Sequence, residues 1–178
     1  LLDNWKHDLV DRRIRYHPLG TLLHVVSGNV LVGGAFSLAM GCITKNINII
    51  KTSSSLQQFP LLLAKSIQVS DTENIVRDTF SIINWKGGNK EIEQIVKQSC
   101  DGFIIWGGED VVQNYRVGRR NSSRLVEFGP KVSLGVISEQ GWKETDKNLL
   151  SSYIARDIAL WDQQSCSSPQ IIFVEGKN

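Results

Sequence analysis

Cys166 is the residue whose type and position most strongly suggest chemistry. It follows a long amphipathic helix pattern and precedes an apolar run at residues 171–174, with serines on both sides and Pro169 beyond them. A thiol between a helix and a strand leaves room for an incoming carbonyl carbon, and the thiolate is the most nucleophilic side chain near neutral pH. The alternative is a small apolar residue in a core, which is the commoner role of a lone cysteine.

Short segments after the predicted strands carry residues that can bind a phosphate or a sugar. Lys51, Ser53 and Ser54 offer one cation and several hydroxyl donors, although a serine at this point also caps the following helix. Gly107 and Gly108 allow a phosphate to approach the backbone at a helix amino terminus. The acidic first turn of that helix weakens this reading, and a simple turn explains the two glycines equally well.

Asn29 and Glu127 are the remaining polar candidates. Asn29 follows a predicted strand, so its amide can face a developing oxyanion, but an ordinary turn residue is the alternative. Glu127 precedes a Gly-Pro break, where a buried carboxylate with a raised pKa can accept a proton; the alternative is a surface glutamate on an edge strand. No Gly-x-Gly-x-x-Gly or Walker-type loop occurs, so neither an ordinary Rossmann dinucleotide site nor phosphoryl transfer is supported.

An alternating series of strands and helices must position these residues. Hydrophobic spacing predicts helices at residues 1–16, 30–40, 56–70, 91–99, 109–116 and 146–161. Strands are predicted at residues 21–26, 48–51, 79–85, 102–106, 125–128, 132–137 and 171–174. The alternation implies one α/β layered domain with a parallel sheet and crossover connections.

Length and composition exclude several classes of protein. The 178 residues are 41% hydrophobic, enough for one buried core. No apolar run reaches the roughly 20 residues that cross a bilayer, and no signal segment is seen, so we expect a cytoplasmic protein without a membrane span. Three scattered cysteines and three histidines lack the spacing of disulfide frameworks or metal sites. A net charge of +2, with one basic cluster at residues 116–124, does not favour a nucleic-acid partner.

Taken in order, the segments around Asn29, Lys51, Gly107, Glu127 and Cys166 resemble those of the aldehyde dehydrogenase superfamily. The resemblance spans almost the whole chain. Within the superfamily, the chain is most similar to LuxC-type acyl-CoA reductases, which make long-chain aldehyde for bacterial bioluminescence. The phrases that carry this closer resemblance are residues 28–30, 45–51, 128–133 and 160–163.

The resemblance implies an architecture. We expect an α/β, aldehyde-dehydrogenase-like fold in which helices flank a parallel sheet. Residues 1–160 then form an NAD(P)-binding, Rossmann-like cofactor domain, and residues 161–178 hold the nucleophile loop and the start of a truncated catalytic domain. Because family members are much longer, the chain is expected to be a fragment of a two-domain enzyme.

The resemblance also implies a role for each candidate residue. Ser54 stands where many NAD-preferring members carry a glutamate that binds the ribose, and a serine there relieves repulsion toward a 2′-phosphate, so NADPH is the expected cofactor. Ser53 is expected to bind the cofactor beside it. The other implied roles are Cys166 as nucleophile, Asn29 as oxyanion donor, Glu127 as general base, Lys51 as the adenosine-ribose contact, and Gly107 with Gly108 as the turn near the pyrophosphate.

The implied activity is NADPH-dependent reduction of a long-chain acyl-CoA, or another acyl thioester, to a fatty aldehyde through a cysteine acyl-enzyme. Two alternatives stay open, namely aldehyde oxidation by an NAD(P)-dependent dehydrogenase and a non-catalytic nucleotide-binding domain that keeps the fold. The resemblance further implies a homo-oligomer and acyl-transferase or synthetase proteins as partners.

Overall fold

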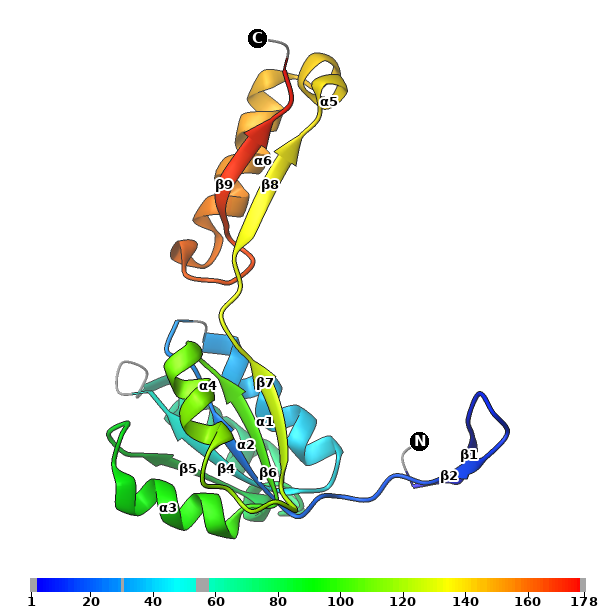
Figure 1. Cartoon of the computed structure of the whole chain (residues 1–178), viewed down its shortest axis with the longest axis vertical. Coiled ribbons are helices and arrows are strands. Elements are labelled where there is room, and N and C mark those ends of the chain that lie inside the picture. The colour runs from blue at the N-terminus through cyan, green and yellow to red at the C-terminus, as the bar shows by residue number, and fades with distance from the viewer. Residues whose placement is uncertain (1–2, 30, 54–57, 177–178) are drawn as a thin grey trace. The chain divides into compact units, whose positions relative to one another are not determined.

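We analysed a computed structural model of the chain, which describes residues 3–29, 31–53 and 58–176. The chain divides into two compact units, Leu1–Gly129 and Pro130–Asn178, and each is described by itself. Figure 1 shows the larger unit as a sheet wrapped by helices and the smaller one as two strands beside a helix. The expected α/β class is confirmed.

The larger unit is built around a parallel sheet of five strands in the order β5-β4-β3-β6-β7. Every neighbouring pair runs parallel, so the carboxyl ends of all five strands lie at the same edge. All five apolar patterns agree with the observed strands to within one residue at each end, as the bounds show. These bounds are β3 Thr21–Val25, β4 Ile47–Thr52, β5 Phe80–Asn84, β6 Gly102–Trp106 and β7 Arg124–Phe128.

Helices cover both faces of this sheet and create two apolar cores. One core joins α3 and α4 to strand residues such as Leu23, Phe103 and Ile105, each at most 1% exposed. The other joins α1 and α2 to Val26 and Ile50 on the opposite face. The bounds are α1 Leu31–Ile43, α2 Gln58–Ser70, α3 Lys90–Ser99 and α4 Glu109–Arg116.

The chain order of the strands reverses between β3 and β6. The chain passes from β3 outward through β4 to β5, and then returns to the other side of β3 to form β6 and β7. Such a reversal is a topological switch point, and ligands of open α/β sheets bind in the crevice that it leaves at the carboxyl edge. We therefore expect a ligand site at the loops that follow β3 and β6.

The smaller unit is one β-α-β arrangement. Strand β8, Ser133–Ile137, pairs in parallel with β9, Pro169–Val174, and helix α6, Lys147–Ala159, lies between them in sequence. A short helix α5, Glu139–Glu144, precedes α6 and was not predicted. The sequence predicted one continuous series of strands, whereas β8 and β9 form a sheet separate from the first. Pro130 has no backbone N–H to donate, which favours a break in strand pairing after β7.

Two local predictions were wrong. A helix was predicted over residues 1–16, but the described residues 3–16 contain instead a hairpin of β1, Lys6–His7, and β2, Arg13–Ile14. The Asp8 carboxylate accepts hydrogen bonds from the backbone of Val10 and Arg12, so a side chain stabilises a turn in place of helical bonds. Helix α1 also continues past residue 40 to Ile43. None of the described helices is long and apolar enough to cross a bilayer.

Candidate functional site

The parallel sheet brings most of the predicted site residues to one edge. Lys51 is the second-to-last residue of strand β4, and Ser53 follows the end of that strand. Glu127 is the fourth residue of β7, opposite Ile105 of β6, while Gly107 directly follows β6. Asn29 is an exposed residue on the loop between β3 and α1. The list of predicted residues also includes Ser54, which lies outside the described residues.

Lys51 is half-buried beside an aromatic ring. Its Nζ lies 5.3 Å from the centre of the Trp85 ring, in a cation–π arrangement, and 3.4 Å from the carbonyl oxygen of Thr52. Burial lowers the pKa of the Lys51 ammonium group, and the negative charge of Glu93 opposes that shift. A partly desolvated cation at this edge is suited to an anionic or hydroxyl-rich ligand.

The Gly107-Gly108 turn borders open space at Gly108, whereas a Cβ at Gly107 would lie 3.1 Å from the Cβ of Val111. The N–H of Gly107 donates to the carbonyl oxygen of Phe128 at 3.3 Å, which ties the turn to the end of β7. A Cβ on Gly108 would meet no atom within 4 Å, and Gly108 caps α4 without any side-chain hydrogen bond. The first amides of α4 therefore lack a side-chain cap and stand beside open space, as a bound pyrophosphate requires. The acidic residues Glu109 and Asp110 in that first turn oppose an anion.

Glu127 is held by an arginine. Both of its oxygens accept hydrogen bonds from Arg116, one from Nε and one from Nη2, each at 2.6 Å. This contact lowers the pKa of the Glu127 carboxyl below its ordinary value. The expectation of a raised pKa was therefore wrong, because β7 is an edge strand and the carboxylate meets a cation rather than an apolar core.

A buried chain of hydrogen bonds that includes His24 was not predicted from the sequence. Trp106 Nε1 donates to Ser37 Oγ at 3.2 Å, and Ser37 Oγ lies 2.7 Å from His24 Nδ1. His24 Nε2 then lies 3.0 Å from Oδ1 of Asn48, which fixes Nε2–H as the donor and leaves Nδ1 as acceptor. Burial lowers the pKa of His24. The Trp106 ring also stacks on Phe128, with ring centres 3.9 Å apart, so the chain orders the ends of β6 and β7.

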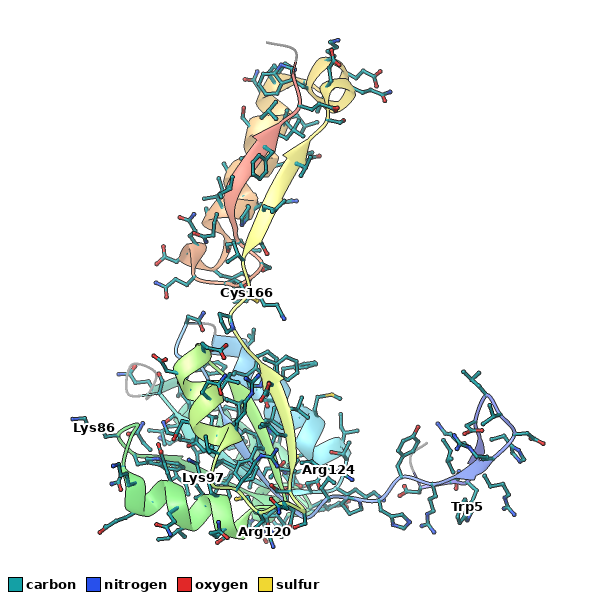
Figure 2. All side chains as sticks on the ribbon, viewed as in Figure 1. Trp5, Lys86, Lys97, Arg120, Arg124 and Cys166 are labelled. Carbon is teal, nitrogen blue, oxygen red and sulfur yellow. The ribbon has the colours of Figure 1, made fainter. Side chains whose placement is uncertain are left out.

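Cys166 belongs to the smaller unit, on the loop between α6 and β9 (Figure 2). Its thiol is exposed, and its backbone carbonyl accepts a hydrogen bond from Ser133 Oγ at 2.6 Å. Ser168, which is 2% exposed, donates to the carbonyl of Leu160 and fixes the base of the loop. The positive φ angles of Trp161, Asp162 and Gln163 turn the chain sharply before the loop. The loop thus presents the thiol outward from a fixed base.

The basic cluster at residues 116–124 is engaged in internal contacts. Arg120 pairs with Asp101 at 2.7 Å, and Arg119 donates to the carbonyl of Ser123 at 2.9 Å. With Arg116 paired to Glu127, three of the four arginines stabilise local structure rather than a ligand site.

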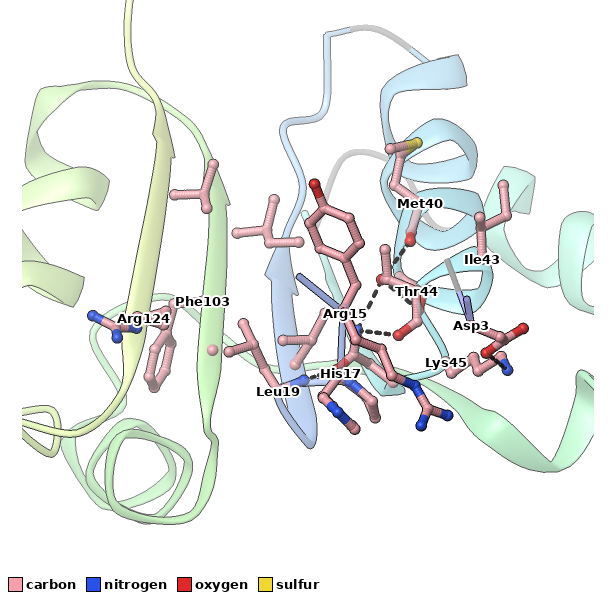
Figure 3. Close-up of a pocket in the computed structure, with 18 residues that line it drawn as sticks. Asp3, Arg15, His17, Leu19, Met40, Ile43, Thr44, Lys45, Phe103 and Arg124 are labelled. Carbon is pink, nitrogen blue, oxygen red and sulfur yellow. Dashed lines mark hydrogen bonds and ion pairs between the residues drawn. The ribbon is translucent and has the colours of Figure 1, made fainter. Parts of the chain in front are cut away.

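A cavity of about 470 Å³ lies at the opposite edge of the sheet (Figure 3). Its walls include Leu19, which precedes β3, and Gly102 and Arg124, which begin β6 and β7. These positions mark the amino ends of the strands. The cavity is therefore separate from the edge that holds Lys51 and the Gly107-Gly108 turn.

Comparison with known proteins gives a family and a fold. A model of the family described as acyl-CoA reductase (LuxC) matches residues 1–178. A long-chain acyl-protein thioester reductase 2 of Photobacterium leiognathi is 33% identical over 162 residues, which cover 89% of this chain and 33% of that protein. A long-chain acyl-protein thioester reductase of Photorhabdus luminescens is 31% identical over 180 residues, covering 100% of this chain and 36% of that protein.

Solved structures with the same fold are aldehyde dehydrogenases. A lactaldehyde dehydrogenase superposes with a TM-score of 0.77 at 14% identity, covering 97% of this chain and 36% of that one. A betaine aldehyde dehydrogenase of Staphylococcus aureus, solved with NAD+, superposes with a TM-score of 0.75 at 15% identity and covers 92% of this chain and 32% of that one. The chain thus spans about a third of the length of the relatives that it matches.

Proposed function

The chain belongs to the acyl-CoA reductase (LuxC) family. From this membership we propose that it takes part in the NADPH-dependent reduction of a long-chain acyl thioester to a fatty aldehyde. The relatives' names specify an acyl-protein and the family description an acyl-CoA. Both donors present the same thioester carbonyl, so the proposal covers both. The word acyl-protein in the relatives' names supports acyl-transferase or synthetase proteins as partners, and we include such partners and a homo-oligomer in the proposal.

The observation that carries the proposal is the exposure of one thiol. Of the three cysteines, Cys166 is exposed, Cys42 is partly buried and Cys100 is buried. Burial raises the pKa of Cys100 to about 11, so that thiol is not a nucleophile near neutral pH. In the proposed reaction the Cys166 sulfur attacks the thioester carbonyl, a new carbon–sulfur bond forms, and the donor thiolate leaves. The Asn29 amide is proposed to stabilise the oxyanion of this attack.

The carboxyl edge of the five-stranded sheet is proposed to bind the nicotinamide nucleotide. Lys51 and Ser53 are suited to the adenosine ribose, and the uncapped α4 terminus beside Gly107 and Gly108 is suited to the pyrophosphate. When bound, the reduced nucleotide supplies the hydride that the acyl group accepts. The absence of a glutamate at position 54 supports NADPH over NADH. Clear preference for NADH in equilibrium binding would overturn that choice.

The pairing of Glu127 with Arg116 favours reduction over aldehyde oxidation. Oxidation requires water to be activated by a general base, and a carboxylate whose pKa is lowered by a bidentate arginine is a weaker base. Reduction of a thioester needs no water. We therefore assign Glu127 at most a proton-transfer role during release of the aldehyde.

Comparison of Cys166→Ala with the unmodified protein tests the proposal. Aldehyde formation from a long-chain acyl-CoA with NADPH should be lost, whereas the affinity for NADPH should stay within about twofold, because Cys166 lies outside the unit that holds Lys51. The matched control is Cys100→Ser, which should keep aldehyde formation in the fraction of protein that folds. Undiminished turnover by Cys166→Ala would refute the nucleophile.

A further inference from the structure

Glu93 on α3 is a buried carboxylate that has no role in the proposed reaction. It is 5% exposed, although carboxylates are rarely buried without partners. Its Oε1 accepts a hydrogen bond from the backbone N–H of Gly88 at 3.0 Å, and its Oε2 accepts one from Nδ2 of Asn114 at 2.8 Å. One carboxylate therefore joins α3 to α4 and also to the turn that precedes α3.

The turn that Glu93 holds lies at the carboxyl edge of the sheet. It connects β5 to α3, and β5 lies beside β4 with Thr52 paired to Asn84. Gly88 has a φ of +84°, a conformation that glycine adopts readily. A Cβ at Gly88 would meet no atom within 4 Å, so the backbone of the turn borders open space. Lys86, labelled in Figure 2, marks the start of this turn.

Lys51 reaches the same turn from β4. Its Nζ lies over the ring of Trp85, which directly follows β5, and the negative charge of Glu93 opposes the loss of its proton. Among the described residues, Tyr115 on α4 interacts electrostatically with Glu93, and Lys97 on α3 contacts Asn114, which is hydrogen-bonded to Glu93. Lys97 Nζ lies 3.1 Å from Oδ1 of Asn114. The pKa of Tyr115 is raised, mainly by burial and to a smaller extent by the negative charge of Glu93.

We propose that Glu93 is a positioning residue of the nucleotide site: it holds the β5–α3 turn through Gly88 and keeps the Lys51 ammonium group beside that turn. Together the turn and the ammonium group receive the phosphorylated adenosine ribose of NADPH. This inference rests on the proposed use of NADPH. Asn84 reinforces the same arrangement, because its Nδ2 donates to the carbonyl of Thr52 at 3.2 Å and to its hydroxyl at 3.0 Å.

Equilibrium binding of NADPH to Glu93 variants tests this inference. Glu93→Ala should weaken NADPH binding by roughly tenfold, the factor expected when one hydrogen bond that orders a site is lost. Glu93→Gln keeps an oxygen that accepts from Gly88, although its amide nitrogen cannot accept from Asn114, so it should bind NADPH more tightly than Glu93→Ala at neutral pH. The matched control is Asn89→Ala, which removes the side chain that caps α3 through the N–H of Ile92 but leaves the Glu93–Gly88 bond. Its affinity should stay within about twofold of the unmodified protein, since a lost cap affects stability more than the site.

The pH dependence of NADPH binding distinguishes a positioning role of Glu93 from a role in folding alone. Without the charge of Glu93, Lys51 loses its proton more readily, so NADPH affinity in Glu93→Gln should decline at a lower pH than in the unmodified protein. Lys51→Met should remove that decline. If the unmodified protein binds NADPH and Glu93→Ala matches it, or if Asn89→Ala weakens binding as much as Glu93→Ala, the inference is wrong and the proposed function stands. If the unmodified protein binds neither NADPH nor NADH, the proposed function fails and the inference fails with it.

Discussion

Replacing Gly41 by alanine should destabilise the larger unit, although alanine is the better helix former. Gly41 lies within α1, and a Cβ there would stand 1.9 Å from Asn48 Oδ1 and 3.0 Å from His24 Nε2. Asn48 and His24 are both 0% exposed, and the Asn48 amide also donates to the carbonyl of Asn46 at 2.7 Å. The added methyl group must therefore displace Asn48 and break buried hydrogen bonds.

The two opposing effects differ in size. Leaving two buried polar groups unsatisfied costs about 1–3 kcal/mol each. Replacing glycine by alanine in a helix interior returns about 1 kcal/mol. The free energy of unfolding should therefore fall by about 1–5 kcal/mol in Gly41→Ala, as measured by urea unfolding that is followed by the fluorescence of the buried Trp85.

Gly33→Ala provides a control in the same helix with the opposite expected sign. A Cβ at Gly33 would meet no atom within 4 Å, so only the helix preference remains. The free energy of unfolding should rise by about 0.5–1 kcal/mol. If Gly41→Ala proved as stable as Gly33→Ala, the buried contact between His24 and Asn48 would not have the geometry described here.

Three further predictions concern titration and reactivity. Because burial lowers the pKa of His24, its imidazole binds a proton more readily in the unfolded chain than in the folded one. The free energy of unfolding should therefore decrease as pH falls below about 6.5, by at most about 1.4 kcal/mol per pH unit, in urea unfolding at several pH values. If His24→Gln showed the same dependence of unfolding free energy on pH, the assignment to His24 would be wrong. Iodoacetamide should alkylate Cys166 at least tenfold faster than Cys100 at pH 8, because Cys166 is exposed and burial raises the pKa of the Cys100 thiol to about 11. Peptide mapping measures both rates, and equal rates would show that Cys100 is accessible. Arg116→Ala should raise the pKa of Glu127 toward its ordinary value in an NMR titration, because the guanidinium is the main cause of the lowered pKa; an unchanged pKa would mean that the ion pair does not persist in solution.

The strands and helices of the larger unit could be predicted because their apolar spacing agrees with their burial. Helix α4 at Glu109–Arg116 and strand β6 at Gly102–Trp106 have the predicted limits, since glycine or a change of hydrophobic pattern marks their ends. The amino-terminal hairpin could not be predicted, because it depends on hydrogen bonds that the Asp8 carboxylate accepts, which helical spacing does not reveal.

The candidate site was predictable as a set of positions but not as a set of contacts. A parallel sheet places Lys51 and Gly107 at one edge whatever their partners are. The pairing of Glu127 with Arg116 depends on a helix face and an edge strand that meet only in three dimensions. The buried roles of His24 and Glu93 were likewise hidden, since a lone histidine or glutamate carries no spacing signal.

The central claim is that Cys166 carries the acyl group, and intact mass tests it most directly. The protein is mixed with a long-chain acyl-CoA, with and without NADPH, beside Cys166→Ala. The account predicts one acyl adduct that requires Cys166 and disappears when NADPH is added, with one aldehyde formed for each adduct lost. An adduct that survives in Cys166→Ala, or one that NADPH leaves in place, would contradict the account.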